Sequence, residues 1–106
     1  MPALPTSPRL MNRQNTALLI VDVQEAFRES VIEFERMVWN IDRLAQAANL
    51  FKIPVAATQQ YPQGLGTTVA TLAKYSDPEF DKLTFSCREL ATLFEEWQRN
   101  GISSIV

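Results

Sequence analysis

The chain has 106 residues, 46% of them hydrophobic and 21% charged, which is the size and composition of a single ordinary globular domain. Its formal net charge of −2 gives no electrostatic reason to expect binding to nucleic acid or to a membrane surface. It contains no histidine and one cysteine, which excludes Ser-His-Asp and Cys-His catalysis within the chain, an internal disulfide and a thiolate zinc site. We therefore expect neither a metal nor a cofactor.

Residues 1–15 are expected to form a disordered leader. The segment carries three prolines and lacks the apolar stretch of a secretory signal. No acidic residue precedes Asp22, which leaves an organellar targeting segment as a weak alternative, although the prolines argue against the amphipathic helix that such a segment needs. The lone cysteine fits a reducing compartment, so we expect a cytoplasmic protein.

A continuous apolar run over residues 17–21 leads directly into Asp22. Such a run predicts a strand buried on both faces, as in a parallel sheet that is covered by helices. Ligands of open α/β sheets bind beyond the carboxyl ends of the strands, so Asp22 is the first candidate site residue. An aspartate that caps the following turn fits the pattern equally well. If Asp22 serves chemistry alone, Asp22→Asn should change the unfolding free energy by less than about 0.5 kcal/mol.

The next segments predict a strand–helix–strand crossover. Ser30-Val31-Ile32-Glu33 matches a helix capping box. Apolar residues then recur at helical spacing and predict an amphipathic helix ending near Leu50: Phe34, Val38, Ile41, Ala45 and Ala48. Residues 53–58 read as a second buried strand, and a crossover of this length makes the two strands parallel.

A turn-rich loop over residues 59–66 follows the second strand. Its Gly64-Leu65-Gly66-Thr67-Thr68 sequence superficially resembles a phosphate cradle, but the third glycine and the lysine of such loops are missing, so we expect a tight turn. Residues 68–74 predict a short helix that residues 76–78 break. Residues 79–85 predict a short third strand that carries Lys82.

Ser86-Cys87-Arg88-Glu89 is a second capping box, and it opens a helix that should end at Gly101. The inner face of this helix is expected to hold Leu90, Leu93, Phe94 and Trp97. Residues 102–106 begin a fourth strand, after which we expect a truncated domain with an exposed apolar edge. Trp97 and Phe94 should then be partly unburied, and the chain should self-associate as a homo-oligomer.

Three motifs occur in the order of a known family: residues 19–27, 58–66 and 82–86. Together they resemble the isochorismatase-like cysteine hydrolase superfamily, most closely its isochorismatase-domain-containing branch, from about residue 15 to residue 106. In that branch the second motif usually reads Thr-Glu-Gln-Tyr-Pro, so Gln59 replaces a glutamate. The resemblance implies a Rossmann-like, three-layer α/β/α fold with a parallel sheet in the order 3-2-1-4. Residues 16–106 would be the amino-terminal part of the domain.

The family uses an aspartate, a lysine and a cysteine, and the resemblance assigns the first two to Asp22 and Lys82. The family cysteine follows the fourth strand, and no position of this chain matches it. In the full site a thiolate would attack an amide or similar carbonyl while the aspartate accepts the thiol proton. We expect Phe27, Gln60 and Tyr61 to line the pocket of a small-molecule substrate. Cys87, at the first turn of a helix, is expected to be a packing thiol.

The leading hypothesis is therefore an isochorismatase-like hydrolase acting on a small amide or related substrate, truncated and inactive alone. A second is a non-catalytic family member that acts by associating with other subunits. A third is a receiver-like phosphoacceptor domain, which normally has paired acids after the first strand and an acceptor aspartate after a later one. Val21 and residues 56–58 supply neither.

Overall fold

The computed structural model describes residues 5, 7, 10–75 and 79–106. Part of the expected leader and the expected helix break at 76–78 lie outside these residues. In chain order the elements are β1 (Thr16–Val21), η1 (Glu25–Phe27), α1 (Phe34–Leu50), β2 (Val55–Gln60), α2 (Pro62–Leu65), α3 (Ala70–Ala73), β3 (Glu79–Lys82), η2 (Cys87–Leu90), α4 (Ala91–Arg99) and β4 (Ser104–Ile105), where η marks a 3-10 helix. Within the described residues, no helix is both long and apolar enough to cross a membrane.

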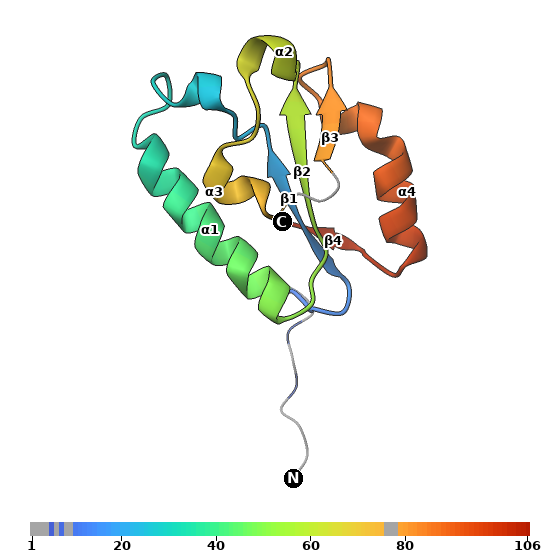
Figure 1. Cartoon of the computed structure of the whole chain (residues 1–106). Coiled ribbons are helices and arrows are strands. Elements are labelled where there is room, and N and C mark those ends of the chain that lie inside the picture. Colours follow the sequence, from blue (N-terminus) through green and yellow to red (C-terminus); the bar gives the residue numbers. More distant parts are fainter. Residues whose placement is uncertain (1–4, 6, 8–9, 76–78) are drawn as a thin grey trace.

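The strands form one four-stranded sheet in the order β3-β2-β1-β4, and every neighbouring pair is parallel. The predicted 3-2-1-4 order is confirmed. Val21 lies opposite Thr58, and Gln60 lies opposite Lys82. The carboxyl ends of β1, β2 and β3 therefore meet at one edge of the sheet, next to α2 (Figure 1).

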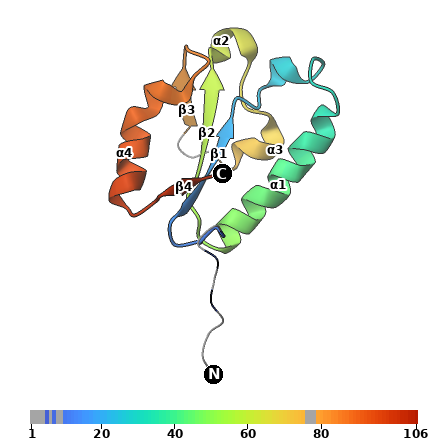
Figure 2. The same cartoon turned by 180° about the vertical axis from the view of Figure 1, so that it is seen from behind.

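Helices cover both faces of the sheet, which confirms the three-layer α/β/α architecture. Figures 1 and 2 show α1 and α3 on one face and α4 on the other. A first apolar cluster joins the sheet to α1 and α3 and includes Leu18, Ile20, Val23, Phe34, Val38, Ala45, Ala48, Ala57, Val69 and Leu72. A second cluster joins the opposite face to α4 and contains Ala17, Ala56, Leu90, Leu93 and Trp97.

The expectation that Trp97 would be partly unburied is wrong, because only 7% of this residue is exposed. Trp97 belongs to the second cluster together with Ala17 and Ala56, whose small side chains leave room for the indole ring on this face of the sheet. Phe94 is partly buried, as expected, and its ring centroid lies 6.2 Å from that of Trp97.

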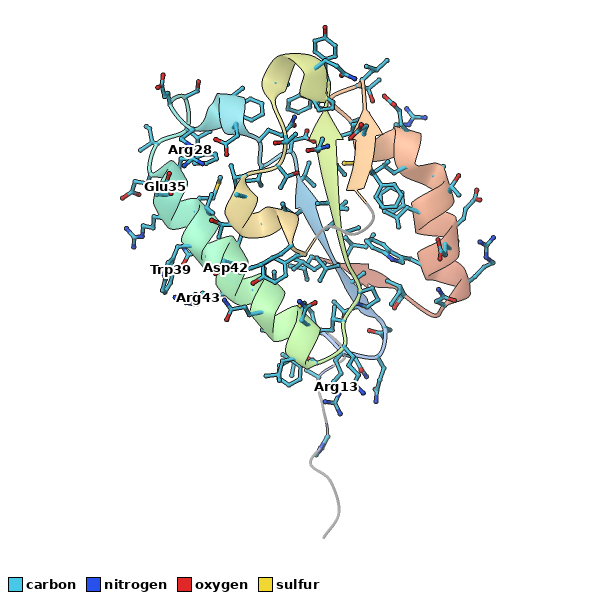
Figure 3. All side chains as sticks on the ribbon, viewed as in Figure 1. Arg13, Arg28, Glu35, Trp39, Asp42 and Arg43 are labelled. Carbon is cyan, nitrogen blue, oxygen red and sulfur yellow. The ribbon has the colours of Figure 1, made fainter. Side chains whose placement is uncertain are left out.

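The first predicted capping box is wrong. α1 begins at Phe34, and its N-cap is Glu33, which has a left-handed φ of 56° and makes no capping hydrogen bond with its side chain. Ser30 lies in a tight turn, since its backbone N–H donates to the Phe27 carbonyl. Arg28 of this turn forms ion pairs with Glu25 and with Glu35 in the first turn of α1 (Figure 3). These ion pairs connect the turn to the first turn of α1 at the surface, and they do not replace the missing cap.

The second capping box is confirmed in one half only. The Ser86 hydroxyl oxygen accepts a hydrogen bond from the Arg88 backbone N–H at 3.1 Å, as a cap should. Glu89 does not return the bond to Ser86 and instead accepts from the backbone of residues 83 and 84. The segment starts as the 3-10 helix η2, and α4 begins at Ala91.

Several element boundaries differ from the prediction. β2 extends to Gln60, so Gln59 and Gln60 belong to the strand and not to the loop. β3 ends at Lys82, three residues earlier than predicted. β4 lies at the sheet edge, where Ile105 is 51% exposed, in agreement with the expected apolar edge.

A polar network connects α1 with the residues that follow α3. Asp42 accepts a hydrogen bond from the Tyr75 hydroxyl, and Lys74 lies 3.8 Å from the same carboxylate. The bond from Tyr75 lowers the pKa of Asp42, and the same bond raises the pKa of Tyr75. Figure 3 shows Asp42 on α1 beside Trp39 and Arg43. The guanidinium carbon of Arg43 lies 3.7 Å from the centroid of the Trp39 ring.

Candidate active site

Asp22 follows the last residue of β1 and adopts a left-handed φ of 53°. Its backbone N–H donates to the carbonyl of Thr58 at 3.2 Å and to the Thr58 hydroxyl oxygen at 3.1 Å. Its carboxylate accepts from the Thr58 hydroxyl at Oδ1 (2.8 Å) and from the Lys82 ammonium at Oδ2 (2.8 Å). The carboxylate thus faces the neighbouring strands, and the interpretation of Asp22 as a cap for the following turn is wrong.

Lys82 is the last residue of β3, and its side chain is 0% exposed. Its ammonium donates to Asp22 Oδ2 at 2.8 Å and to the carbonyl oxygens of Thr84 and Phe85, each at 3.0 Å. A lysine ammonium has three N–H donors, so every donor is used. Burial of this charge is tolerated because a carboxylate compensates it and hydrogen bonds satisfy its remaining protons.

Gln24 joins the ends of β1 and β2, a role that the sequence analysis missed. It is 0% exposed, and its amide nitrogen donates to the carbonyls of Gln60 (2.9 Å) and Gly66 (2.7 Å). Its amide oxygen accepts from the Gln60 backbone N–H at 2.8 Å. The signal in the sequence was an amide side chain three residues after the apolar strand, within the first of the three family-like motifs.

Gln59 fixes the loop that follows α2. Its amide oxygen accepts from the backbone N–H (2.7 Å) and the hydroxyl (3.3 Å) of Thr68. Its amide nitrogen donates to Asp81 Oδ1 at 2.9 Å. A glutamate, the usual residue of the resembling branch, could accept from Thr68 but could not donate to Asp81. The pair with Asp81 on β3 therefore requires an amide, and not a carboxylate, at position 59.

The three predicted pocket residues have different surroundings. Phe27 is partly buried against the first apolar cluster. Gln60 lies opposite Lys82 in the sheet, with its backbone held by Gln24. Tyr61 is 52% exposed, and its ring lies over Gly64, where an added Cβ would come within 2.4 Å of the ring. The structure thus brings Asp22, Lys82 and Thr58 into contact, while a role of Phe27, Gln60 and Tyr61 in a substrate pocket stays a prediction.

Cys87 is partly buried and packs against the second apolar cluster, as expected of a packing thiol.

The Gly64–Gly66 segment forms the end of α2, and Gly66 has a φ of 80°, so the predicted tight turn is confirmed. Over the described residues, no group of three or more histidine, cysteine, aspartate or glutamate side chains could hold a metal ion.

The arrangement at this edge suits proton transfer. The Asp22 side chain is 13% exposed, so it remains partly accessible while the paired lysine is enclosed. A carboxylate in this position can accept a proton from a bound molecule or donate one to it. The adjacent buried ammonium and the Thr58 hydroxyl hold the carboxylate in one orientation.

Comparisons with known proteins identify the family and the fold of the chain. The family model described as the isochorismatase domain matches residues 16–106. Isochorismatase domain-containing protein 2 of Danio rerio is 38% identical over 76 residues, which cover 72% of this chain and 39% of the relative. The Homo sapiens protein of the same name is 38% identical over 72 residues, covering 68% of this chain and 35% of the relative. The chain thus spans little more than a third of these curated relatives.

Solved structures share the fold. The MAR1 ribonuclease from Caenorhabditis elegans superposes with a TM-score of 0.73 and 29% identity, covering 91% of this chain and 64% of that chain. The Escherichia coli YcaC protein, an octameric hydrolase of unknown specificity, superposes with a TM-score of 0.77 over 94% of this chain and 52% of its own; at 21% identity this likeness concerns the fold alone. Because the family model matches residues 16–106 of the 106-residue chain, the chain belongs to the isochorismatase family.

Proposed function

We propose that this chain supplies the aspartate and the lysine of a hydrolase site for a small amide or a related substrate. One observation carries the proposal: a fully buried Lys82 ammonium lies 2.8 Å from the Asp22 carboxylate where β1 and β3 end. Ligands of parallel α/β sheets bind at this edge, and replacing a buried ion pair by apolar residues is often neutral or stabilising, so stability alone does not account for a pair at this place. Asp22 would transfer protons, and Lys82 would balance and orient its charge.

For an amide substrate, the chemistry needs a thiol in addition to this pair. Asp22 would take the thiol proton, the thiolate would attack the carbonyl carbon, and Asp22 would return the proton to the nitrogen as the carbon–nitrogen bond breaks. Water would then hydrolyse the thioester. Cys87 packs in the second cluster, so this route requires a thiol other than Cys87. For an enol-ether substrate, Asp22 alone can act as the general acid, and no thiol is required.

The test is turnover by the full chain on simple amides, on an alkyl vinyl ether and on a short RNA. The variants are Asp22→Asn and Cys87→Ser, with Glu96→Gln on the exposed side of α4 as the matched control. Vinyl-ether turnover that Asp22→Asn abolishes and Cys87→Ser and Glu96→Gln leave unchanged supports the proposal. Near-ultraviolet circular dichroism establishes that each variant is folded.

Other outcomes count against parts of the proposal. Amide turnover that depends on Cys87 would overturn its assignment to packing. Turnover that is insensitive to Asp22→Asn would remove Asp22 from the chemistry. RNA cleavage by the wild type without any amide or ether turnover would replace the proposed substrate class. No turnover on any substrate would leave the chain without activity of its own and favour the second function.

The second candidate function is association with other subunits, and the β4 edge favours it. Ile105 and Val106 are 51% and 45% exposed at this edge. A cavity of about 330 Å³ opens nearby, lined mainly by apolar residues: Met11, Arg13, Thr16, Ala17, Leu18, Leu44, Ala47, Ala48, Phe51, Ile53 and Val106. Sedimentation velocity over a concentration series should show self-association that Ile105→Lys weakens. A strictly monomeric wild type would rule this function out for the chain alone.

A further inference from the structure

The loop that follows β3 provides two of the three acceptors of the Lys82 ammonium. These are the carbonyl oxygens of Thr84 and Phe85, each 3.0 Å from Nζ. The pairing of Lys82 with Asp22 therefore depends on where this loop lies. If the loop moved away, two of the three N–H donors of the ammonium would lose their partners and become available to another group.

Apolar packing does not hold the loop in place. Leu83 and Phe85 are 73% and 86% exposed, and Thr84 between them is exposed as well. The Thr84 hydroxyl donates to the Ser86 carbonyl, which is a bond within the same segment. The position of this loop must therefore come from polar contacts with a neighbouring element.

Glu89 of η2 makes these contacts. Its carboxylate accepts from the Thr84 backbone N–H at 2.7 Å and from the Leu83 backbone N–H at 3.2 and 3.3 Å. Hydrogen bonding from Thr84 is the main cause that lowers the pKa of Glu89 below its ordinary value of 4.5. The two backbone N–H groups and the two carbonyls thus connect Glu89, through one short loop, to the Lys82 ammonium.

We propose that Glu89 is a positioning residue that keeps the loop closed over Lys82 and so determines whether the ammonium is fully bonded or free to meet a ligand. The hydrogen-bond relay follows from the contacts alone. Only its catalytic meaning rests on the proposed hydrolase function, in which Lys82 orients Asp22. In the closed arrangement Lys82 has no N–H left for a substrate, so direct binding of a substrate by Lys82 requires the loop to open.

The chain suits a spectroscopic test because it has only three lysines, Lys52, Lys74 and Lys82. In the full-length protein labelled with ¹⁵N-lysine, the Nζ protons of Lys52 and Lys74 should exchange rapidly with water because both residues are exposed. The Lys82 protons should exchange slowly because the side chain is buried and fully bonded. Glu89→Ala should speed the exchange at Lys82 by about tenfold or more, as expected when a charge-assisted hydrogen bond no longer closes a local opening.

Three comparisons separate this result from general destabilisation. Glu96→Ala, which removes another exposed glutamate nearby, should leave exchange at Lys82 unchanged. The Leu18 backbone amide, bonded to Pro54 in the sheet, should remain protected in Glu89→Ala if the opening is local. Glu89→Gln keeps one side-chain oxygen as acceptor and should restore part of the protection, and it serves as the test variant if Glu89→Ala does not fold.

Unchanged exchange at Lys82 in both Glu89 variants would overturn the inference, and so would a parallel loss of protection at Leu18. Because exchange is measured without substrate, its outcome is separate from that of the turnover assay. Faster exchange at Lys82 together with no hydrolysis would support the relay and count against the hydrolase. Hydrolysis together with unchanged exchange would support the hydrolase and count against the relay.

Discussion

Replacing Asp22 with asparagine should lower the free energy of unfolding by about 3 kcal/mol. Exposed ion pairs contribute only about 0–1 kcal/mol, whereas breaking a buried pair by removing one partner costs roughly 3–5 kcal/mol. Here the Lys82 side chain is 0% exposed and Asp22 is 13% exposed, so the pair belongs to the buried class. The carbonyls of Thr84 and Phe85 still bond the stranded ammonium, which places the cost at the lower end of that range.

This value exceeds the change of about 0.5 kcal/mol that is expected if Asp22 serves chemistry alone. The difference arises because the Asp22 carboxylate compensates the buried charge of Lys82 on another strand. The sequence around Asp22 does not indicate this contact. Lys82→Met should cost less than Asp22→Asn, since the partly exposed Asp22 carboxylate can gain water in place of the ammonium. The double variant should recover much of the loss, as it leaves no uncompensated buried charge.

The assay is urea denaturation followed by tryptophan fluorescence, in which Trp97, buried in the second cluster, reports unfolding and Trp39, 54% exposed, contributes a background. The two single variants and the double variant complete a double-mutant cycle with the wild type, which isolates the coupling between the two side chains. A coupling near zero, with a loss below about 1 kcal/mol in Asp22→Asn, would refute the argument. Such a result would mean that water reaches Lys82 in solution.

Three further variants test the loops and the network on α1. Gln59→Glu should destabilise the chain by about 1 kcal/mol in urea denaturation, since it replaces the bond to Asp81 with a repulsion, and Asp81→Asn should restore the loss. Gly66→Ala should cost roughly 1–3 kcal/mol by the same measurement, because its φ of 80° and ψ of 174° lie in a region that only glycine adopts readily. Tyr75→Phe removes the bond that raises the Tyr75 pKa above 10.0 and lowers the Asp42 pKa below 3.8. The stability difference from the wild type should be largest between these pH values, shrinking as pH rises through the folded pKa of Tyr75 or falls through that of Asp42; a pH-independent difference would contradict this assignment.

The strands and the helices that cover them could be predicted from the sequence because the spacing of apolar residues reflects burial, whereas the 3-2-1-4 order of the strands was implied by the family resemblance. An unbroken apolar run such as residues 17–21 fits a strand covered on both faces, and helical spacing from Phe34 to Ala48 indicates a helix with one buried side. The helix start at Ser30 was predicted incorrectly, since the backbone N–H groups of Ser30 and Val31 both donate to the Phe27 carbonyl and form a turn there, and α1 begins only at Phe34.

The site was predicted only in part for a related reason. Asp22 could be found from the end of its strand and from a family motif, and Lys82 from a family motif alone. Their contact, and the contribution of Thr58, depend on the register between strands, which no single segment encodes. Glu89 was interpreted as a cap because its spacing from Ser86 fits one, whereas its carboxylate bonds the loop after β3. The partners of such a residue become visible only when the segments are placed in space.

The amide of Gln24 links the end of β2 to the loop that follows α2. It holds both backbone groups of Gln60 and the carbonyl of Gly66, and a single torsion of its side chain displaces all three bonds at once. A rotation of this amide would therefore free the end of β2 and the loop at Gly66 together. The strand end and the loop, six residues apart in the sequence, thus share one side chain as their common support.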